Sequence, residues 1–141
     1  MHTIQFGIPT VIISHVVRMV ALTPVPEAPA GIAGIMNYHG NIIPVFSLRR
    51  HFSLPERKER SSDYLLVIKK KRTLAVIAET INQVSGLSGE LVSPETIYPG
   101  IGGITGVYRS RDGIVVIADP DTLFSVRDEE QLRRIIHPDG I

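Results

Sequence analysis

The sequence predicts a mainly β protein whose hairpins close, or nearly close, into small barrels. First, most of the 141 residues fall into β-branched runs of about four to eight residues bounded by Gly, Pro, Asp or Asn, the pattern of short strands. Second, hairpin signals recur, and Asp112-Gly113 is among the strongest of them. Third, helical patterns are few and short. Because a barrel leaves no strand edge exposed, a series of hairpins favours that architecture.

Strand-like runs follow one another along the chain, and tight turns are predicted between several neighbours. These turns fall near His39-Gly40, near Lys70-Lys71 and at Asp112-Gly113. The runs, in order, are TIQF (3–6), TVII (10–13), NIIPVF (41–46), DYLLVIKK (63–70), RTLAVIAETI (72–81), GITGVYR (103–109) and GIVVIAD (113–119).

Two short helices are predicted where a serine precedes an apolar pattern. Ser14 is expected to cap a helix over 15–20, and Ser47 a helix over 48–52. The physical reason is that a serine oxygen accepts a hydrogen bond from an otherwise unpaired backbone N–H at a helix start.

Helical signals also mark the end of the sequence. Asp119-Pro120 opens a short helix, because proline at the first helical position gives up no hydrogen bond. The longest helical pattern covers 128–136, with acidic residues early and basic residues late, as the helix dipole favours. Its apolar face consists of Leu132, Ile135 and Ile136.

Two connections differ in character. The segment 22–31 contains three prolines and is predicted to be extended, rigid and poor in hydrogen-bond donors. The segment 54–63 is rich in charged residues and is predicted to be a solvated loop.

Composition excludes several function classes. The chain has no cysteine, which rules out disulfides, thiolate zinc sites and cysteine nucleophiles. Fifteen basic and fourteen acidic residues leave a net charge of +1, so no overall field favours nucleic acid or acidic lipid. We find neither an apolar run of about 20 residues that would span a bilayer nor a secretion signal. A soluble cytoplasmic protein is therefore expected.

The patterns that carry catalysis or metal binding are weak. The five histidines include no His-x-x-x-His pair, so surface or interface positions are favoured over a metal site. The glycine-rich stretch 99–106 lacks the ending of a nucleotide loop and is predicted to be a bend or bulge. No Gly-x-Ser-x-Gly nucleophile motif occurs. The paired acids Asp119 and Asp121 lie at a predicted helix start, where capping explains them. The basic stretch 69–72 has no interleaved aromatic residues, so a solvated turn is favoured over an RNA contact. The residues predict a binding module without catalytic residues, metal or cofactor.

The stretch from Val25 to Leu54 carries a specific order of motifs. A proline-bearing loop precedes Gly-hydrophobic-x-Gly, then Asn-x-x-Gly, an apolar strand with proline, and a Leu-Arg pair opening a short helix. This order resembles the signature of the CheW-like family of chemotaxis coupling proteins, and the similarity extends over about Thr3 to Phe124. The residues in register are Gly31, Ile32, Gly34, Asn37, Gly40, Ile43, Pro44, Val45, Leu48, Arg49 and Phe52.

The resemblance implies a fold and a function. The implied fold is two small five-stranded β-barrels packed around a shared core, with a few short helices and a C-terminal helix. The CheW-like domain would cover 1–126 and a helical tail 127–141. The implied function is a non-enzymatic adaptor that couples the cytoplasmic tips of methyl-accepting chemoreceptors to the regulatory domain of a CheA-type histidine kinase. We expect it in receptor arrays at the inner face of the membrane, without bound nucleic acid or membrane insertion.

The sequence departs from the family signature at two places. The family has Asn-Leu-Arg-Gly where this chain has Asn37, Tyr38, His39 and Gly40, and histidine is mostly neutral near pH 7 and forms fewer donor contacts than arginine. Ser47-Leu48-Arg49 stands in place of Asp-Leu-Arg. These changes suggest an alternative function: a specialised family member of a twitching-motility or other chemosensory pathway, which binds only one of the two partners. The segment 1–13 is also short for a full first hairpin. Two explanations remain: a first barrel with fewer strands, or a true start of the chain farther upstream.

The predicted partner contacts gather at this turn and along the strand after it. Asn and Gly tolerate positive φ, so Asn37 and Gly40 suit the turn backbone, and Tyr38 and His39 are expected to point outward. The predicted partner-binding residues are Asn37, Tyr38, His39, Gly40, Ile42, Val45 and Arg49.

Overall fold

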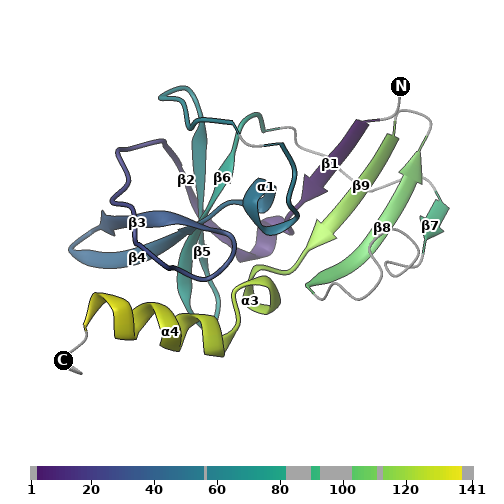
Figure 1. Ribbon diagram of the computed structural model, residues 1–141. Helices are drawn as coiled ribbons and strands as arrows, with labels where there is room; N and C mark the ends of the chain where they lie inside the picture. The colour runs from purple at the N-terminus through teal and green to yellow at the C-terminus, as the bar shows by residue number, and fades with distance from the viewer. Residues whose placement is uncertain (1–2, 56, 82–89, 93–102, 111–112, 138–141) are drawn as a thin grey trace. The chain divides into compact units, whose positions relative to one another are not determined.

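The computed structural model is mainly β, as the sequence predicts, and it describes residues 3–55, 57–81, 90–92, 103–110 and 113–137 (Figure 1). Its strands are β1 (Thr3–Gly7), β2 (Ile13–Arg18), β3 (Ile32–Tyr38), β4 (Asn41–Phe46), β5 (Tyr64–Lys69), β6 (Thr73–Ala78), β7 (Glu90–Val92), β8 (Ile104–Ser110) and β9 (Gly113–Ala118). Its helices are the 3₁₀ helix η1 (Thr10–Ile12) and the α-helices α1 (Leu48–His51), α3 (Pro120–Leu123) and α4 (Val126–Ile136).

The chain forms two compact units, each with one sheet. The first unit combines Met1–Val11 with Asn82–Leu123, and the second combines Ile12–Ile81 with Phe124–Ile141. Both units are therefore assembled from segments that are far apart in the sequence.

The sheet of the first unit has the strand order β1-β9-β8-β7. β8 and β9 form the antiparallel hairpin predicted around Asp112-Gly113, although residues 111–112 themselves lie outside the described residues. β1 pairs with β9 in parallel, from Thr3 with Gly113 to Gly7 with Ile117. The described residues of this unit give four strands. The run 10–13, predicted as a strand, instead forms η1 over Thr10–Ile12, and Ile13 begins β2.

The glycine-rich stretch enters β8 at a close approach of two segments, as predicted. Gly103 has φ = +88°, and a Cβ there would collide with the side chain of Leu123 in α3. The register shifts between Ile104 and Gly106, which marks a bulge. α3 begins at Pro120, again as predicted, and residues 99–102 lie outside the described residues.

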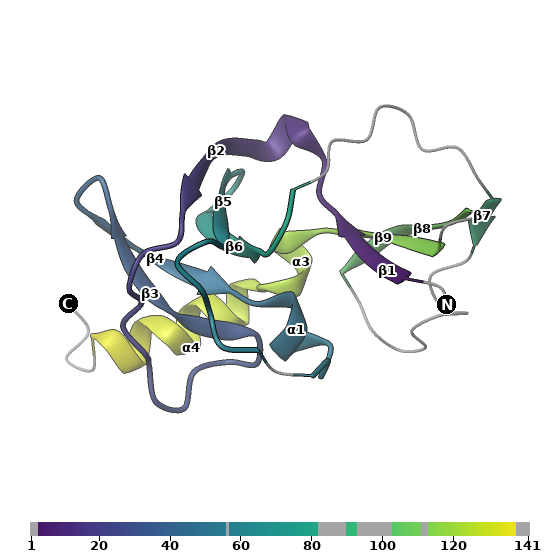
Figure 2. The ribbon, with the colours of Figure 1, turned by 90° about the horizontal axis from the view of Figure 1, so that it is seen from above.

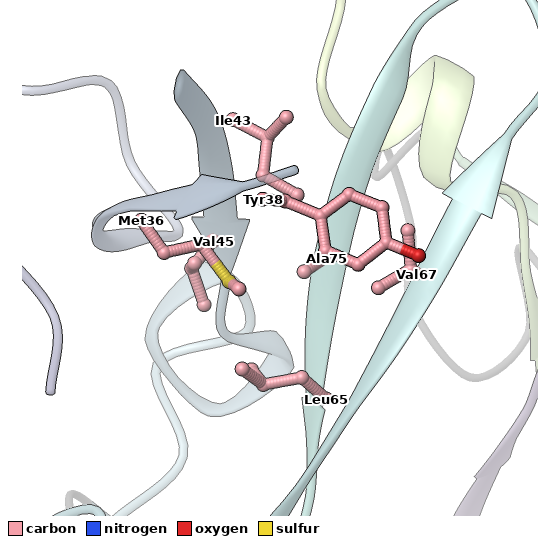
Figure 3. Close-up of a cluster of buried hydrophobic side chains, with 7 residues drawn as sticks. All are labelled: Met36, Tyr38, Ile43, Val45, Leu65, Val67 and Ala75. Carbon is pink, nitrogen blue, oxygen red and sulfur yellow. The ribbon is translucent and has the colours of Figure 1, made fainter. Parts of the chain in front are cut away.

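The sheet of the second unit has the strand order β2-β5-β6-β4-β3. Neighbours are antiparallel except for β4 and β6, which are parallel over two residue pairs. Its interior is filled by side chains from four strands that point toward one another (Figure 3). These are Met36, Tyr38, Ile43, Val45, Leu65, Val67 and Ala75.

The prediction of closed barrels is wrong. Closure requires the two edge strands of a sheet to pair, here β2 with β3. Instead, Thr23 in the proline-bearing segment occupies the outer edge of β3: its N–H donates to the Ile35 carbonyl at 3.0 Å, and the Ile35 N–H donates back at 2.9 Å. A Cβ at Gly34 would lie 2.7 Å from the Thr23 carbonyl oxygen, so this position needs glycine.

The helix predicted over 15–20 is also wrong, because Ile13–Arg18 is a strand. Val16 and Val17 are β-branched residues that favour extended backbone, and they pair with Leu66 and Leu65 of β5. Sheet pairing therefore outweighs the serine at position 14 as a helix cap.

The predicted cap at Ser47 is confirmed, and the structure adds a cap at Ser125 that was not predicted from the sequence. The Ser47 hydroxyl accepts the Arg50 N–H at 3.3 Å and starts α1. Ser125 caps α4 and exchanges hydrogen bonds with Asp128, so this helix begins two residues before the predicted start. Both views show α4 lying along the β3–β4 hairpin, with Leu132 buried (Figures 1 and 2).

Candidate partner-docking surface

Two tight turns meet at one end of the second unit's sheet. Because β4 and β6 are parallel while β3 and β5 run against them, the β3–β4 and β5–β6 turns share one end. We call this the turn end, and it carries His39-Gly40 and residues 70–72. The opposite end, which we call the loop end, carries α1, Asp63 and Glu79. The predicted partner contacts divide between these two ends.

The β3–β4 turn is a two-residue hairpin loop. His39 and Gly40 both have positive φ, 52° and 85°, as a type I′ turn requires. Asn37 keeps an extended backbone and contributes its side chain, whose Oδ1 accepts the Gly40 N–H at 2.9 Å. The predicted turn is confirmed, but its positive-φ residues are His39 and Gly40, not Asn37 and Gly40.

Tyr38 lies in the core and does not point outward as predicted. Its side chain is only 8% exposed, whereas His39 is exposed. The reason is the two-residue period of a strand, which places Met36 and Tyr38 on the same inner face. That alternation was a sequence signal, and it would have corrected the prediction for Tyr38.

The Tyr38 side chain joins the two edges of the open sheet. Its hydroxyl lies 2.9 Å from Nδ1 of His15 on β2, in hydrogen-bonding distance. The Lys69 ammonium lies 5.8 Å from the centre of the Tyr38 ring, and the His39 ring packs edge-on at 4.3 Å. A side-chain contact therefore connects β2 and β3 where the backbone ladder does not.

Arg49 is engaged inside the protein at the loop end. Its Nε and Nη2 donate to the two carboxylate oxygens of Glu79, and its Nη1 donates to the Pro55 carbonyl at 2.9 Å. The hydrogen bonds from Arg49 hold the pKa of the Glu79 carboxyl below its ordinary value. This geometry gives Arg49 a structural role, and its predicted partner contact stays a prediction.

Asp63 anchors the segment 54–63, which the sequence predicts to be solvated. Asp63 is 2% exposed and accepts hydrogen bonds from the Arg57 guanidinium at 2.6 Å and from the Arg60 N–H at 2.9 Å. Burial by itself would raise the pKa of Asp63, but these bonds and the nearby arginine charges outweigh it and lower the pKa. The buried carboxylate of Asp63 thus holds the loop against the start of β5, together with the ion pair between Arg57 and Glu79.

The last two predicted residues have opposite environments. Val45 is completely buried, so its side chain belongs to the core. Ile42 is 54% exposed and lines a groove between the β3–β4 hairpin and α4. This groove has a volume of about 200 Å³, and its apolar lining includes Ile35, Ile42, Pro44, Leu132 and Ile136.

The structure thus brings Asn37, His39, Gly40 and Ile42 together at the turn end and separates Arg49 from them. Sequence reasoning missed His15, Lys69 and the α4 side of the groove as neighbours of this turn. The period-two pattern indicated which strand residues share a face, and the hairpin signals indicated three neighbouring pairs of strands, but no sequence signal indicated the other neighbours.

Two negative findings apply to the described part of the chain. Within residues 3–55, 57–81, 90–92, 103–110 and 113–137, no three His, Asp or Glu side chains gather closely enough to hold a metal ion. In the same residues, each helix is too short or too polar to cross a membrane.

A packed interior, exposed turns and a small apolar groove are features suited to docking another protein. The CheW-like domain family matches residues 1–128. The chain belongs to the CheW-like family, and the resemblance noted from its motifs is confirmed. Membership identifies it as a scaffolding or adaptor protein of chemotaxis and not an enzyme.

Similar proteins carry consistent names. The chain is 30% identical over 138 residues to the chemotaxis protein CheW of Treponema pallidum (strain Nichols), covering 92% of this chain and 81% of that one. It is 26% identical over 116 residues to the chemotaxis protein CheW of Helicobacter pylori, covering 80% and 70%. The crystal structure of the scaffolding protein TtCheW from Thermoanaerobacter tengcongensis superposes with a TM-score of 0.73 at 23% identity, covering 87% and 82% of the two chains, and shows a shared fold.

Proposed function

We propose that this protein couples the cytoplasmic tips of chemoreceptors to the regulatory domain of a CheA-type histidine kinase, in the cytoplasm and within receptor arrays. The observation that carries the proposal is the match of the CheW-like domain to residues 1–128. The exposed turn end supports it, since His39 and Ile42 are available to a partner. The mechanism is docking, with a signal transmitted as a shift in how the partners are held.

The test is binding to both partners at once. The chain is immobilised and exposed to a receptor-tip fragment, to a kinase regulatory domain, and then to both together. Each is expected to bind alone, and the two together are expected to give a ternary complex. A purified chain that binds neither fragment contradicts the proposal.

A second candidate is a specialised adaptor that binds only one of these partners. The observation that favours it is Tyr38-His39, where the family signature has Leu-Arg: the exposed turn residue His39 takes the place of a permanently charged arginine. The same experiment separates the candidates, because binding to one fragment only would support the specialised adaptor. His39→Ala is expected to weaken whichever contact uses this turn.

A further inference from the structure

A second cavity of the second unit lies at the loop end, between the proline-bearing segment and α1. Residues 28–32 form one wall, and Arg49, Arg50, Ser53 and Leu54 form the other. Its volume of about 430 Å³ falls within the range of about 300–1,000 Å³ that is typical of small-molecule sites. The cavity is therefore large enough to hold a small ligand, unlike the groove beside α4.

Backbone hydrogen bonds fix the wall formed by residues 28–32. The Ile32 N–H donates to the Pro29 carbonyl at 3.1 Å, and the Gly31 carbonyl accepts the Ser47 N–H at 2.6 Å. The second bond ties this wall to the residue that caps α1. Because the cavity is already formed in the free protein, a ligand would not have to order it, and this lowers the cost of binding.

Backbone in an unfavourable conformation borders the cavity. Ser53, which lines it, has φ = 54°, and Glu27, which precedes the lining residue Ala28, has φ = 59°. Positive φ costs free energy in residues other than glycine, and residues held in this way cluster at ligand sites. Their position supports a binding role for the cavity.

The charge of the cavity favours an anion. Its described lining contains two arginines and no acidic residue. Arg49 is balanced by its hydrogen bonds to Glu79. The one described carboxylate within ion-pair distance of Arg50 is Glu59 at 3.8 Å, which is longer than the roughly 2.7–2.9 Å of a charge-assisted hydrogen bond. The exposed Arg50 guanidinium can therefore bond closely to a ligand.

We infer that this cavity binds a small organic monocarboxylate with an apolar body. The two carboxylate oxygens accept hydrogen bonds from the planar guanidinium of Arg50, a geometry that suits arginine. The apolar body lies against Pro29, Ile32 and Leu54. A single negative charge matches the one lining arginine that the fold does not hold closely. The inference goes beyond the proposed coupling function, since a ligand at the loop end leaves the turn end free for a protein partner.

The test compares hexanoate with hexanamide, an uncharged probe of the same shape. The ¹⁵N-labelled full chain is titrated with each probe. We expect hexanoate to shift the amide resonances of Ala30, Arg50 and Ser53 to saturation and to bind about ten-fold more tightly than hexanamide. Inorganic phosphate has charge but no apolar body, and it is expected to bind more weakly than hexanoate.

Matched variants locate the contact. Arg50→Gln is expected to weaken hexanoate about ten-fold and to leave hexanamide unchanged. This variant should keep its fold, because the hydrogen bond to the Ser47 cap comes from the backbone N–H of residue 50. Arg60→Gln removes the same charge outside the described lining of the cavity and is expected to have little effect. Ala30→Leu adds bulk at the cavity wall and is expected to weaken both probes.

Several results would each overturn the inference: no saturable shifts with hexanoate, equal affinity for hexanoate and hexanamide, or equal losses in Arg50→Gln and Arg60→Gln. Phosphate binding as tight as that of hexanoate would show an unspecific ion contact and would also overturn it. So would displacement of hexanoate by the receptor tip or the kinase domain, which would assign the cavity to a protein partner. Failure of the coupling proposal is a separate result, because that test contains no small ligand.

Discussion

The two ends of the five-stranded sheet use charge in opposite ways. At the loop end, Arg49, Arg57, Asp63 and Glu79 bond to one another and tie the segment 54–63 and α1 to the strand ends. At the turn end, Lys69 and Lys71 are exposed, and neither forms an ion pair with a described carboxylate. Charges satisfied within the fold stabilise it, while charges left in solvent remain available to another molecule. We therefore expect stability to depend on the loop end and binding on the turn end.

The largest expected effect comes from removing the buried carboxylate of the loop end. Asp63→Ala leaves Arg57 without its closest acidic partner and the Arg60 N–H without an acceptor. We expect a loss of about 3 kcal/mol in the free energy of unfolding, measured by urea denaturation. Lys71→Ala at the turn end is the control and should stay within about 0.5 kcal/mol of wild type. Equal losses in the two variants would remove the distinction between the ends.

Two glycines with positive φ provide the next comparison. Gly31 near the loop end has φ = +93°, and a Cβ there would lie 2.6 Å from the Phe46 ring, whereas Gly40 in the turn has φ = +85° and open space around it. Gly40→Ala adds backbone strain of about 1 kcal/mol. Gly31→Ala adds overpacking on top of that strain, and we expect it to cost about 2 kcal/mol more. Similar melting temperatures for the two variants would contradict the tight packing at Gly31.

Acid should destabilise the protein through the loop end. The folded state lowers the pKa of both Asp63 and Glu79, so their contribution is present above their unfolded pKa values and is lost as pH falls through the folded ones. Unfolding free energy is therefore expected to decline below about pH 4. Asp63→Asn should flatten this decline, and an unchanged pH profile in that variant would show that Asp63 is not its source.

The smallest expected effect lies at the turn end. Tyr38→Phe removes the hydroxyl that reaches His15 and keeps the ring in the core. We expect a loss of about 1 kcal/mol in unfolding free energy, typical of one hydrogen bond. The control is His39→Ala, which changes the exposed neighbour of Tyr38. Phe46→Tyr would not be suitable, because the Phe46 ring is fully buried. A loss in Tyr38→Phe no larger than in His39→Ala would count against the bridge between the sheet edges.

Local patterns predicted the elements well. Six of the seven predicted strand runs contain a strand, the exception being 10–13, most of which forms η1. The β3–β4 and β8–β9 hairpins and the Ser47 cap, which also depend on neighbouring residues, are found. The Ser14 helix failed because partner strand β5, distant in sequence, decided the outcome. Closure failed for a similar reason, since it was decided by the pairing of Thr23 with Ile35.

The sequence predicted only part of the candidate site. The turn at His39-Gly40 and the exposed Ile42 follow from local chemistry. The engagement of Arg49 with Glu79 and the position of α4 beside Ile42 depend on long-range packing, which no single stretch of sequence contains.

The most direct test of the division between the ends is hydrogen exchange of the full chain with and without its kinase or receptor partner. We predict slower exchange upon binding in residues 37–42, 69–73 and 132–137, with residues 48–63 unchanged. Slowing confined to 48–63 would contradict the account.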